Sequence, residues 1–165
     1  MFQRLLVAID DTERSDITLS FATAVAKQSG AVVHLFYVNE FAVGTGGMAI
    51  HTNEEAVALL TRAAEQLRAE GIRVTGSARR SSYRQVPQHI ACAADEFAAD
   101  AIVLGSRRRR RLVRLFSGRV RERTVRLTSL PVIMAPAPLD IPLGARLEAA
   151  DLMSAVDNRT RPISA

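Results

Sequence analysis

Short apolar runs alternate along this chain with segments of helical periodicity, and this alternation constrains the fold more than any other feature. The runs expected to form strands are Arg4–Ile9, Ala31–Val38, Ile72–Ala78, Ala101–Leu104 and Val132–Ala135. Most of them are apolar throughout, which is typical of strands buried on both faces of a parallel sheet. The sequence therefore predicts an α/β domain built on five parallel strands.

The segments between these runs predict helices. The expected helices are Ile17–Ser29, Glu54–Glu70, a segment with Pro87 in its first turn, and Gly118–Thr128. Gly30 and Gly71 stand where helices commonly end, because glycine adopts the left-handed conformation needed there. The glycine-containing stretch Asn39–Asn53 is expected to be a loop.

The 165 residues, 48% of them hydrophobic, suit one domain with its own core. We expect this domain to occupy residues 1–138, followed by an extension at 139–165 that forms one short helix over Ala145–Val156. A single cysteine, Cys92, excludes an internal disulfide. No apolar run approaches the roughly 18 residues of a membrane span, and the N-terminus lacks a signal-peptide pattern, so a cytoplasmic protein without a membrane segment is expected.

The positive charge of the chain is concentrated in one segment. Residues 1–106 carry a net charge of −3, residues 107–126 a net charge of +9, and residues 127–165 a net charge of −1. A basic segment of this kind binds polyanions or forms a solvated surface. One interpretation is therefore a module that binds nucleic acid or another phosphate-bearing partner through Arg107–Arg126.

Candidate ligand chemistry stands where two of the apolar runs end. Asp10 follows the first run, and Gly105 follows the fourth. Ligands of parallel α/β sheets bind beyond the carboxyl ends of the strands, so both residues line one crevice if their strands are neighbours. A strand ending in glycine, a loop, and a helix beginning near Gly118 describe a site for a phosphate-bearing ligand, because helix N-termini attract anions.

No residue pattern indicates a catalytic or metal site. His34 lies within a predicted strand, where a hydrogen-bonded core histidine is expected, and His51 and His89 lack the spacing of metal ligands. Cys92 is expected to be an inert packing residue of a helix. Common hydrolase, Walker and dinucleotide-binding motifs are missing from the sequence, so an enzyme that uses a nucleotide is the weakest of the functional hypotheses.

Three stretches of the chain resemble the universal stress protein family. They read LLVAIDDTERSDITLSFATAVAKQSGAVVHLFYV, FAADAIVLGSR and SLPVIMAP, and in this order they cover about residues 3–136. The resemblance implies a parallel sheet in the order 3-2-1-4-5 between four helices, the adenine-nucleotide alpha hydrolase-like fold. It also implies a non-catalytic stress-response protein that forms a homodimer through its last strand, with contacts from Val132, Ile133, Met134 and Ala135.

Many members of that family bind ATP through the motif G-x2-G-x9-G-(S/T) after the fourth strand. Gly105 and Gly118 match its outer glycines, whereas Arg108 stands at the middle glycine and Arg119 at the serine or threonine. The resemblance implies contacts to ATP or another adenine nucleotide from Asp10, Val38, Gly105, Ser106, Arg108, Ser117, Gly118, Arg119 and Val120. Either the two arginines contact phosphate through their guanidinium groups, or the loop is a solvated segment that has lost its ligand.

Overall fold

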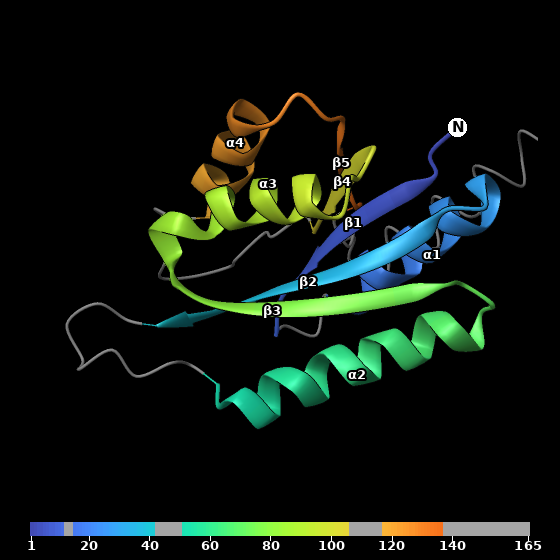
Figure 1. Cartoon of the computed structure of the whole chain (residues 1–165), viewed down its shortest axis with the longest axis horizontal. Helices are drawn as coiled ribbons and strands as arrows, with labels where there is room; N and C mark the ends of the chain where they lie inside the picture. Colours follow the sequence, from blue (N-terminus) through green and yellow to red (C-terminus); the bar gives the residue numbers. More distant parts are fainter. Residues whose placement is uncertain (12–14, 42–50, 106–116, 137–165) are drawn as a thin grey trace, which may run out of the picture.

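A parallel five-stranded sheet forms the centre of the domain (Figure 1). The computed structural model describes residues 1–11, 15–41, 51–105 and 117–136. Its elements are β1 (Arg4–Ile9), α1 (Ser15–Ser29), β2 (Val32–Phe41), α2 (Asn53–Ala69), β3 (Val74–Ser82), the short 3-10 helix η1 (Tyr83–Gln85), α3 (Val86–Glu96), β4 (Ala101–Leu104), α4 (Ser117–Leu127) and β5 (Val132–Met134). The strand order is β3-β2-β1-β4-β5 with all pairs parallel, so the predicted fold is confirmed.

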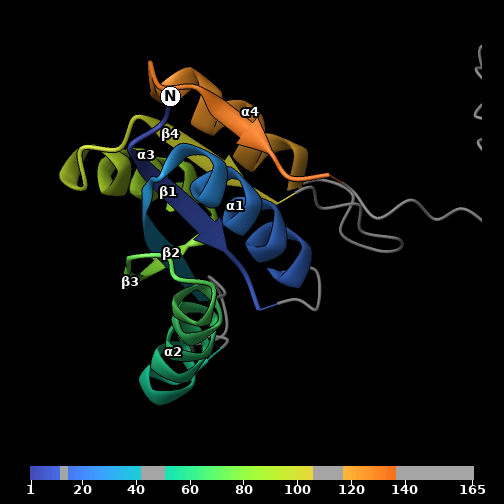
Figure 2. The ribbon, with the colours of Figure 1, turned by 90° about the vertical axis from the view of Figure 1, so that its right-hand side faces the viewer.

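Helices cover both faces of this sheet (Figure 2). Leu5 and Val7 of β1 are fully buried in the cluster under α1 and α2, and Leu6 is fully buried in the cluster under α3 and α4. Successive side chains of a strand point to opposite faces, so a strand buried on both sides must be apolar at every position. The uninterrupted apolar runs of the sequence therefore reflect this three-layer packing.

Local signals in the sequence determine where α1 and α2 begin and end. Thr52 caps α2, because its hydroxyl accepts from the amide of Glu55 while the Glu55 carboxylate accepts from the Thr52 amide. Gly30 and Gly71 follow the two helices with φ values of +72° and +78°. A residue with a side chain is strained in that conformation, and for this reason glycine occupies both positions.

The predicted bounds of two strands differ from the structure by more than one residue. β2 continues through Phe41, so the predicted loop Asn39–Asn53 loses its first three residues to the strand. β3 begins at Val74 and runs to Ser82, four residues beyond its predicted end. β3 lies at an edge of the sheet, and its second half is mostly exposed. Exposed edge residues need no apolar pattern, because only their backbone joins the ladder.

Two side-chain predictions also need revision. Cys92 is exposed, not packed. The buried face of α3 includes Ala91, Ala93 and Ala94, and Cys92 lies outside this face. His34 is satisfied as expected, with its two ring nitrogens 2.8 Å from hydroxyls of β3, but its ring is only half-buried. Burial lowers the pKa of this imidazole.

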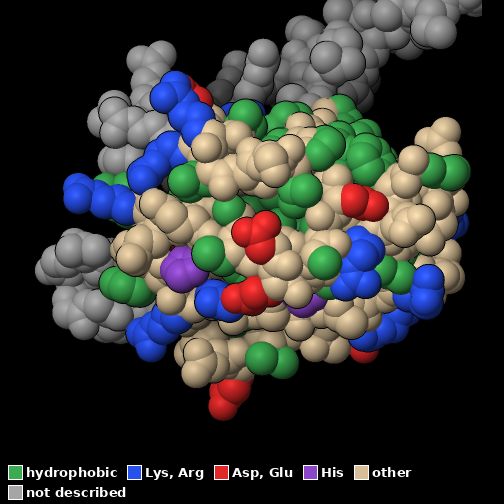
Figure 3. Space-filling model, turned by 45° about the horizontal axis from the view of Figure 1, so that its top comes forward, with side chains coloured by type: hydrophobic (Ala, Val, Ile, Leu, Met, Phe, Trp, Pro, Cys, Tyr) green, Lys and Arg blue, Asp and Glu red, His purple; other side chains and the backbone are tan. Residues whose placement is uncertain are grey.

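None of the helices in the described ranges has the length and apolar character needed to cross a bilayer. The predicted extension at 139–165, with its helix over Ala145–Val156, lies outside the described residues. Figure 3 views the face that carries α3 and α4; hydrophobic side chains gather on its upper part, and basic side chains lie toward its margins.

Candidate functional site

The register of the sheet sets the ends of β1 and β4 beside the middle of β2. β1 lies between β2 and β4, with Ile9 opposite Tyr37 and Ala8 opposite Leu104. Asp10 therefore follows β1 next to Val38 of β2, and Gly105 follows β4 next to Ile9. β1 and β4 are neighbours, as the predicted crevice requires, and this position, defined by Asp10, Val38 and Gly105, is called the crevice.

An apolar wall lies on the α3–α4 side of this edge. Ala8, Val38 and Val120 are partly buried and pack against one cluster, to which Leu104 contributes a buried side chain. These residues come from β1, β2, α4 and β4, so four elements meet at the wall. Partly exposed aliphatic side chains of this kind suit the flat face of a ligand.

The N-terminus of α4 supplies polar backbone groups near the same edge. α4 begins at Ser117, which places Gly118 and Arg119 in its first turn. The first amides of a helix have no partner within the helix and attract anions. Ser106 and Arg108 of the predicted site lie outside the described residues.

Gly105 packs closely against α1. A Cβ added to it would lie 2.8 Å from Oγ1 of Thr18, a side chain of α1 that is 4% exposed. Carbon and oxygen atoms do not approach this closely without displacement, so any other residue at this position would force the buried Thr18 side chain or β4 to shift. The sequence motif gave Gly105 a role toward phosphate; its contact with α1 is an additional constraint.

The turn after β1 is held by Ser15 at the start of α1. The amide of Asp10 donates to Oγ of Ser15 over 3.2 Å, and the Ser15 hydroxyl donates to the carbonyl oxygen of Asp10 over 2.7 Å. These two bonds fix the backbone of Asp10, which is half-buried, at the mouth of the crevice. A rigid backbone restricts where its carboxylate can reach.

A polar cluster around His51 adjoins the crevice on the α2 side. His51 Nε2 lies 3.0 Å from Oδ2 of Asp11, and its Nδ1 lies 3.6 Å from Oε2 of Glu55. The side chain of Asn39, 3% exposed, binds both the amide and the carbonyl oxygen of His51. Burial, followed by the charges of Asp11 and other nearby carboxylates, raises the pKa of Tyr37 to about 12.

Sequence reasoning missed this cluster. It treated His51 as isolated, because the residues around it come from β1, β2 and α2. The available signal in the sequence was Asn39, a polar residue directly after an apolar run. In the structure its side chain is buried and forms hydrogen bonds with the backbone of His51. Among the described residues, no group of three or more histidine, cysteine or acidic side chains is arranged to hold a metal ion.

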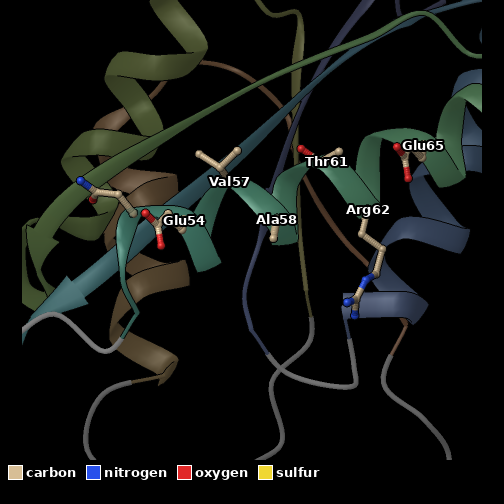
Figure 4. A pocket seen from close by; sticks show the side chains of 7 residues that line it. Glu54, Val57, Ala58, Thr61, Arg62 and Glu65 are labelled. Carbon is tan, nitrogen blue, oxygen red and sulfur yellow. The ribbon is translucent and has the colours of Figure 1, made fainter.

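Two hollows of the described surface lie along α2. One is a groove of about 470 Å³ between α2 and β3, and the other is an open depression of about 620 Å³ on the outer surface of α2. Figure 4 shows side chains that line the depression, with Ala58 and Arg62 pointing away from the strands. Residues 106–116, which hold part of the predicted nucleotide loop, lie outside the described residues.

Comparisons with known proteins agree with this geometry. The model of the universal stress protein family matches residues 1–136. No curated protein matches the chain. A universal stress protein structure from Archaeoglobus fulgidus is 25% identical, covers 82% of this chain and 100% of its own, and superposes with a TM-score of 0.62.

Two further solved structures contain nucleotides. A universal stress protein from Archaeoglobus fulgidus in complex with dAMP is 26% identical, with 81% and 98% of the two chains covered and a TM-score of 0.61. A universal stress protein in complex with cAMP is 18% identical, with 82% and 97% covered and a TM-score of 0.60. The family match spans residues 1–136 and the strand order agrees with it, so this chain belongs to the universal stress protein family.

Proposed function

We propose that this chain binds an adenine nucleotide in the crevice at the carboxyl ends of β1 and β4 and acts through binding, not catalysis. The observation that carries the proposal is the register, which sets Asp10, Val38 and Gly105 side by side where β1 lies between β2 and β4. Further support comes from the relative with dAMP, which shares 26% of its residues with this chain.

Each part of the nucleotide has suitable chemistry at the crevice. The wall of Ala8, Val38 and Val120 offers the apolar surface that an adenine ring requires. The first turn of α4 offers unpaired amides for phosphate. Asp10 provides a carboxylate that can accept from a ribose hydroxyl or the adenine amino group.

Arginine replaces two small residues of the family motif, and we propose that this changes how phosphate is held. Arg119 lies in the first turn of α4, at the position of the motif's hydroxyl. A guanidinium group forms charge-assisted hydrogen bonds with phosphate oxygens, and these are stronger than those of a neutral hydroxyl. Substituting Arg119→Ser should therefore weaken binding of ATP more than binding of adenosine.

Thermal unfolding of the full chain tests the proposed function. We expect ATP, dAMP or cAMP to raise the melting temperature in a saturable way, since a ligand at 100 times its Kd adds about 2.7 kcal/mol of stability. Val38→Lys should abolish the shift by placing charge in the apolar wall. Ala58→Lys adds the same charge to the exposed surface of α2 and should leave the shift intact. Unchanged melting with all nucleotides at millimolar concentration would refute the proposal.

The free edge of β5 supports a second proposal, a homodimer paired through the last strand. Within the described residues β5 pairs only with β4, and Met134 is 37% exposed beside the partly buried Val132 and Ile133. Ala135 is buried, because its amide donates to the carbonyl oxygen of Leu104 and ends the ladder. An exposed strand edge with apolar side chains favours pairing with an identical edge.

Binding of polyanions through Arg107–Arg126 is the second candidate function. The described part of that segment shows Arg123 and Arg126 exposed on α4, although Arg126 is 2.8 Å from Glu122. Affinity for duplex DNA should then fall by roughly 0.9 decades per decade of salt for each phosphate contact. An affinity that is independent of salt would exclude this function.

A further inference from the structure

The outer edge of β3 is open in the described part of the chain. β3 pairs with β2 alone, and the amide of Val33 donates to the carbonyl oxygen of Arg73 over 2.9 Å. In a parallel ladder, alternate residues bond to the same neighbour. Val74, Gly76, Ala78 and Arg80 consequently direct their amides and carbonyl groups away from β2.

One contact confirms that these backbone groups face outward. Nη2 of Arg68 on α2 donates to the carbonyl oxygen of Val74 over 3.3 Å. Among the described residues no strand lies at this edge, so a side chain from α2 can reach this oxygen. The edge thus offers a backbone ladder several residues long.

A groove runs along this edge between β3 and α2. Its volume is about 470 Å³, within the range of roughly 300–1,000 Å³ that is usual for ligand pockets. Small or apolar residues form its floor, namely Leu60, Ala64, Gly76 and Ala78. Gly76 has no side chain to fill the groove. A Cβ at this position would already lie 3.4 Å from both the Leu60 side chain and the Leu35 carbonyl oxygen.

The groove is basic. Arg68, Arg79 and Arg80 line it, and none of its lining residues is an aspartate or glutamate. Nη2 of Arg79 is paired with Glu96 of α3, at 2.6 and 2.8 Å from the two carboxylate oxygens. The bond to the carbonyl oxygen of Val74 holds the Arg68 guanidinium group at the open edge. A strand added at this edge would lie beside that group.

We propose that this groove binds an extended acidic peptide segment of a protein partner, which adds to the sheet as a sixth strand beside β3. The outward backbone groups of β3 supply main-chain hydrogen bonds, the floor accepts small apolar side chains, and Arg68 and Arg80 attract carboxylates. This site is separate from the crevice at β1 and β4 and does not depend on nucleotide binding.

The same charges exclude a second copy of this chain from the edge. Two β3 edges brought together would place arginine against arginine, which is unfavourable. The edge then selects its partner in two ways, because it repels a second β3 edge and attracts an acidic peptide. An acidic partner satisfies both conditions.

Fluorescence anisotropy with the full chain tests this inference. The probe is a labelled, acetylated peptide of alternating glutamate and valine, long enough to span Val74–Arg80. We expect saturable binding, at least tenfold weaker for a peptide with lysine in place of glutamate. Methylation of the peptide's backbone nitrogens on one side should also weaken binding at least tenfold, because it removes main-chain hydrogen bonds without changing charge.

Protein variants locate the peptide. Arg80→Glu should weaken binding of the acidic peptide at least tenfold. Arg62→Glu is the matched control, because Arg62 lies on α2 outside the groove and points away from the strands (Figure 4). Absence of binding at millimolar peptide, equal binding of the methylated peptide, an equal loss in Arg62→Glu, or displacement by duplex DNA at equal affinity would each overturn the proposal.

Discussion

Gly105 shows how one residue serves both the core and the site. The hydroxyl of Thr18 occupies the space where a Cβ would lie, at 2.8 Å. Gly105→Ala should therefore destabilise the protein by about 1–3 kcal/mol through overpacking. In a Thr18→Ala background the nearest remaining atom of that side chain is 3.9 Å away, so the same substitution should be neutral or stabilising.

Urea unfolding of the four proteins in this cycle measures the coupling between the two positions. A cost that is equal in both backgrounds would show that Gly105 is required for a reason other than its contact with Thr18. The prediction concerns packing alone and needs no ligand.

Tyr37 gives a prediction of pH dependence at the same scale. Burial, with the carboxylates of Asp11 and Glu40, raises the pKa of Tyr37 to about 12, whereas an unfolded chain has a tyrosine pKa of about 10. The phenol is thus more readily ionised in the unfolded chain, and the stability it contributes below pH 10 is lost as the pH rises from about 10 toward 12.

Alkaline unfolding, followed by circular dichroism, checks this behaviour. In the Tyr37→Phe variant, the free energy of unfolding should no longer show the decrease that Tyr37 causes between about pH 10 and 12. Tyr83→Phe, which alters the other tyrosine of the chain, should retain it. Identical profiles for the two variants would contradict the assignment.

At the scale of single elements, α2 depends on its capping box. The Thr52 amide and hydroxyl are both bonded to Glu55, and these bonds lower the pKa of the Glu55 carboxyl. Thr52→Ala should cost about 0.5–2 kcal/mol of stability, the usual value for a lost N-cap. Thr61→Ala, an exposed change within the same helix, should cost nothing measurable in urea unfolding. An equal cost at both positions would contradict the role of the cap.

The elements were largely predictable from the sequence because their patterns are local. β1 is apolar at every position after Arg4 and β4 is apolar throughout, and glycines mark the ends of α1 and α2. The second half of β3 was missed, because an exposed edge strand carries no periodic signal. The His51 cluster was missed for a different reason: its members are brought together only by the register of β1 with β2 and by the position of α2.

At the scale of the whole molecule, the two edges of the sheet have opposite character. β5 presents Met134 and partly buried aliphatic side chains, whereas β3 presents arginines. We therefore expect identical chains to meet at β5 and a different, acidic partner to meet β3. The proposed nucleotide site lies between the two edges, at the carboxyl ends of β1 and β4.

Sedimentation equilibrium tests the expected dimer. Met134→Lys should shift the wild-type dimer toward monomer by at least tenfold in dissociation constant, because the substitution places like charges on two facing strands. Met134→Leu keeps the side chain apolar and should remain dimeric. A monomeric wild-type protein, or a dimer unaffected by lysine at this position, would contradict pairing through β5.

The central claim is that an adenine nucleotide binds where β1, β4 and α4 meet. The most direct measurement is an amide NMR titration of the full chain with dAMP and, separately, with ATP. We expect saturable shifts concentrated at Asp10, Val38, Gly105, Gly118 and Val120. No shifts at millimolar nucleotide, or shifts confined to the groove between α2 and β3, would contradict the account.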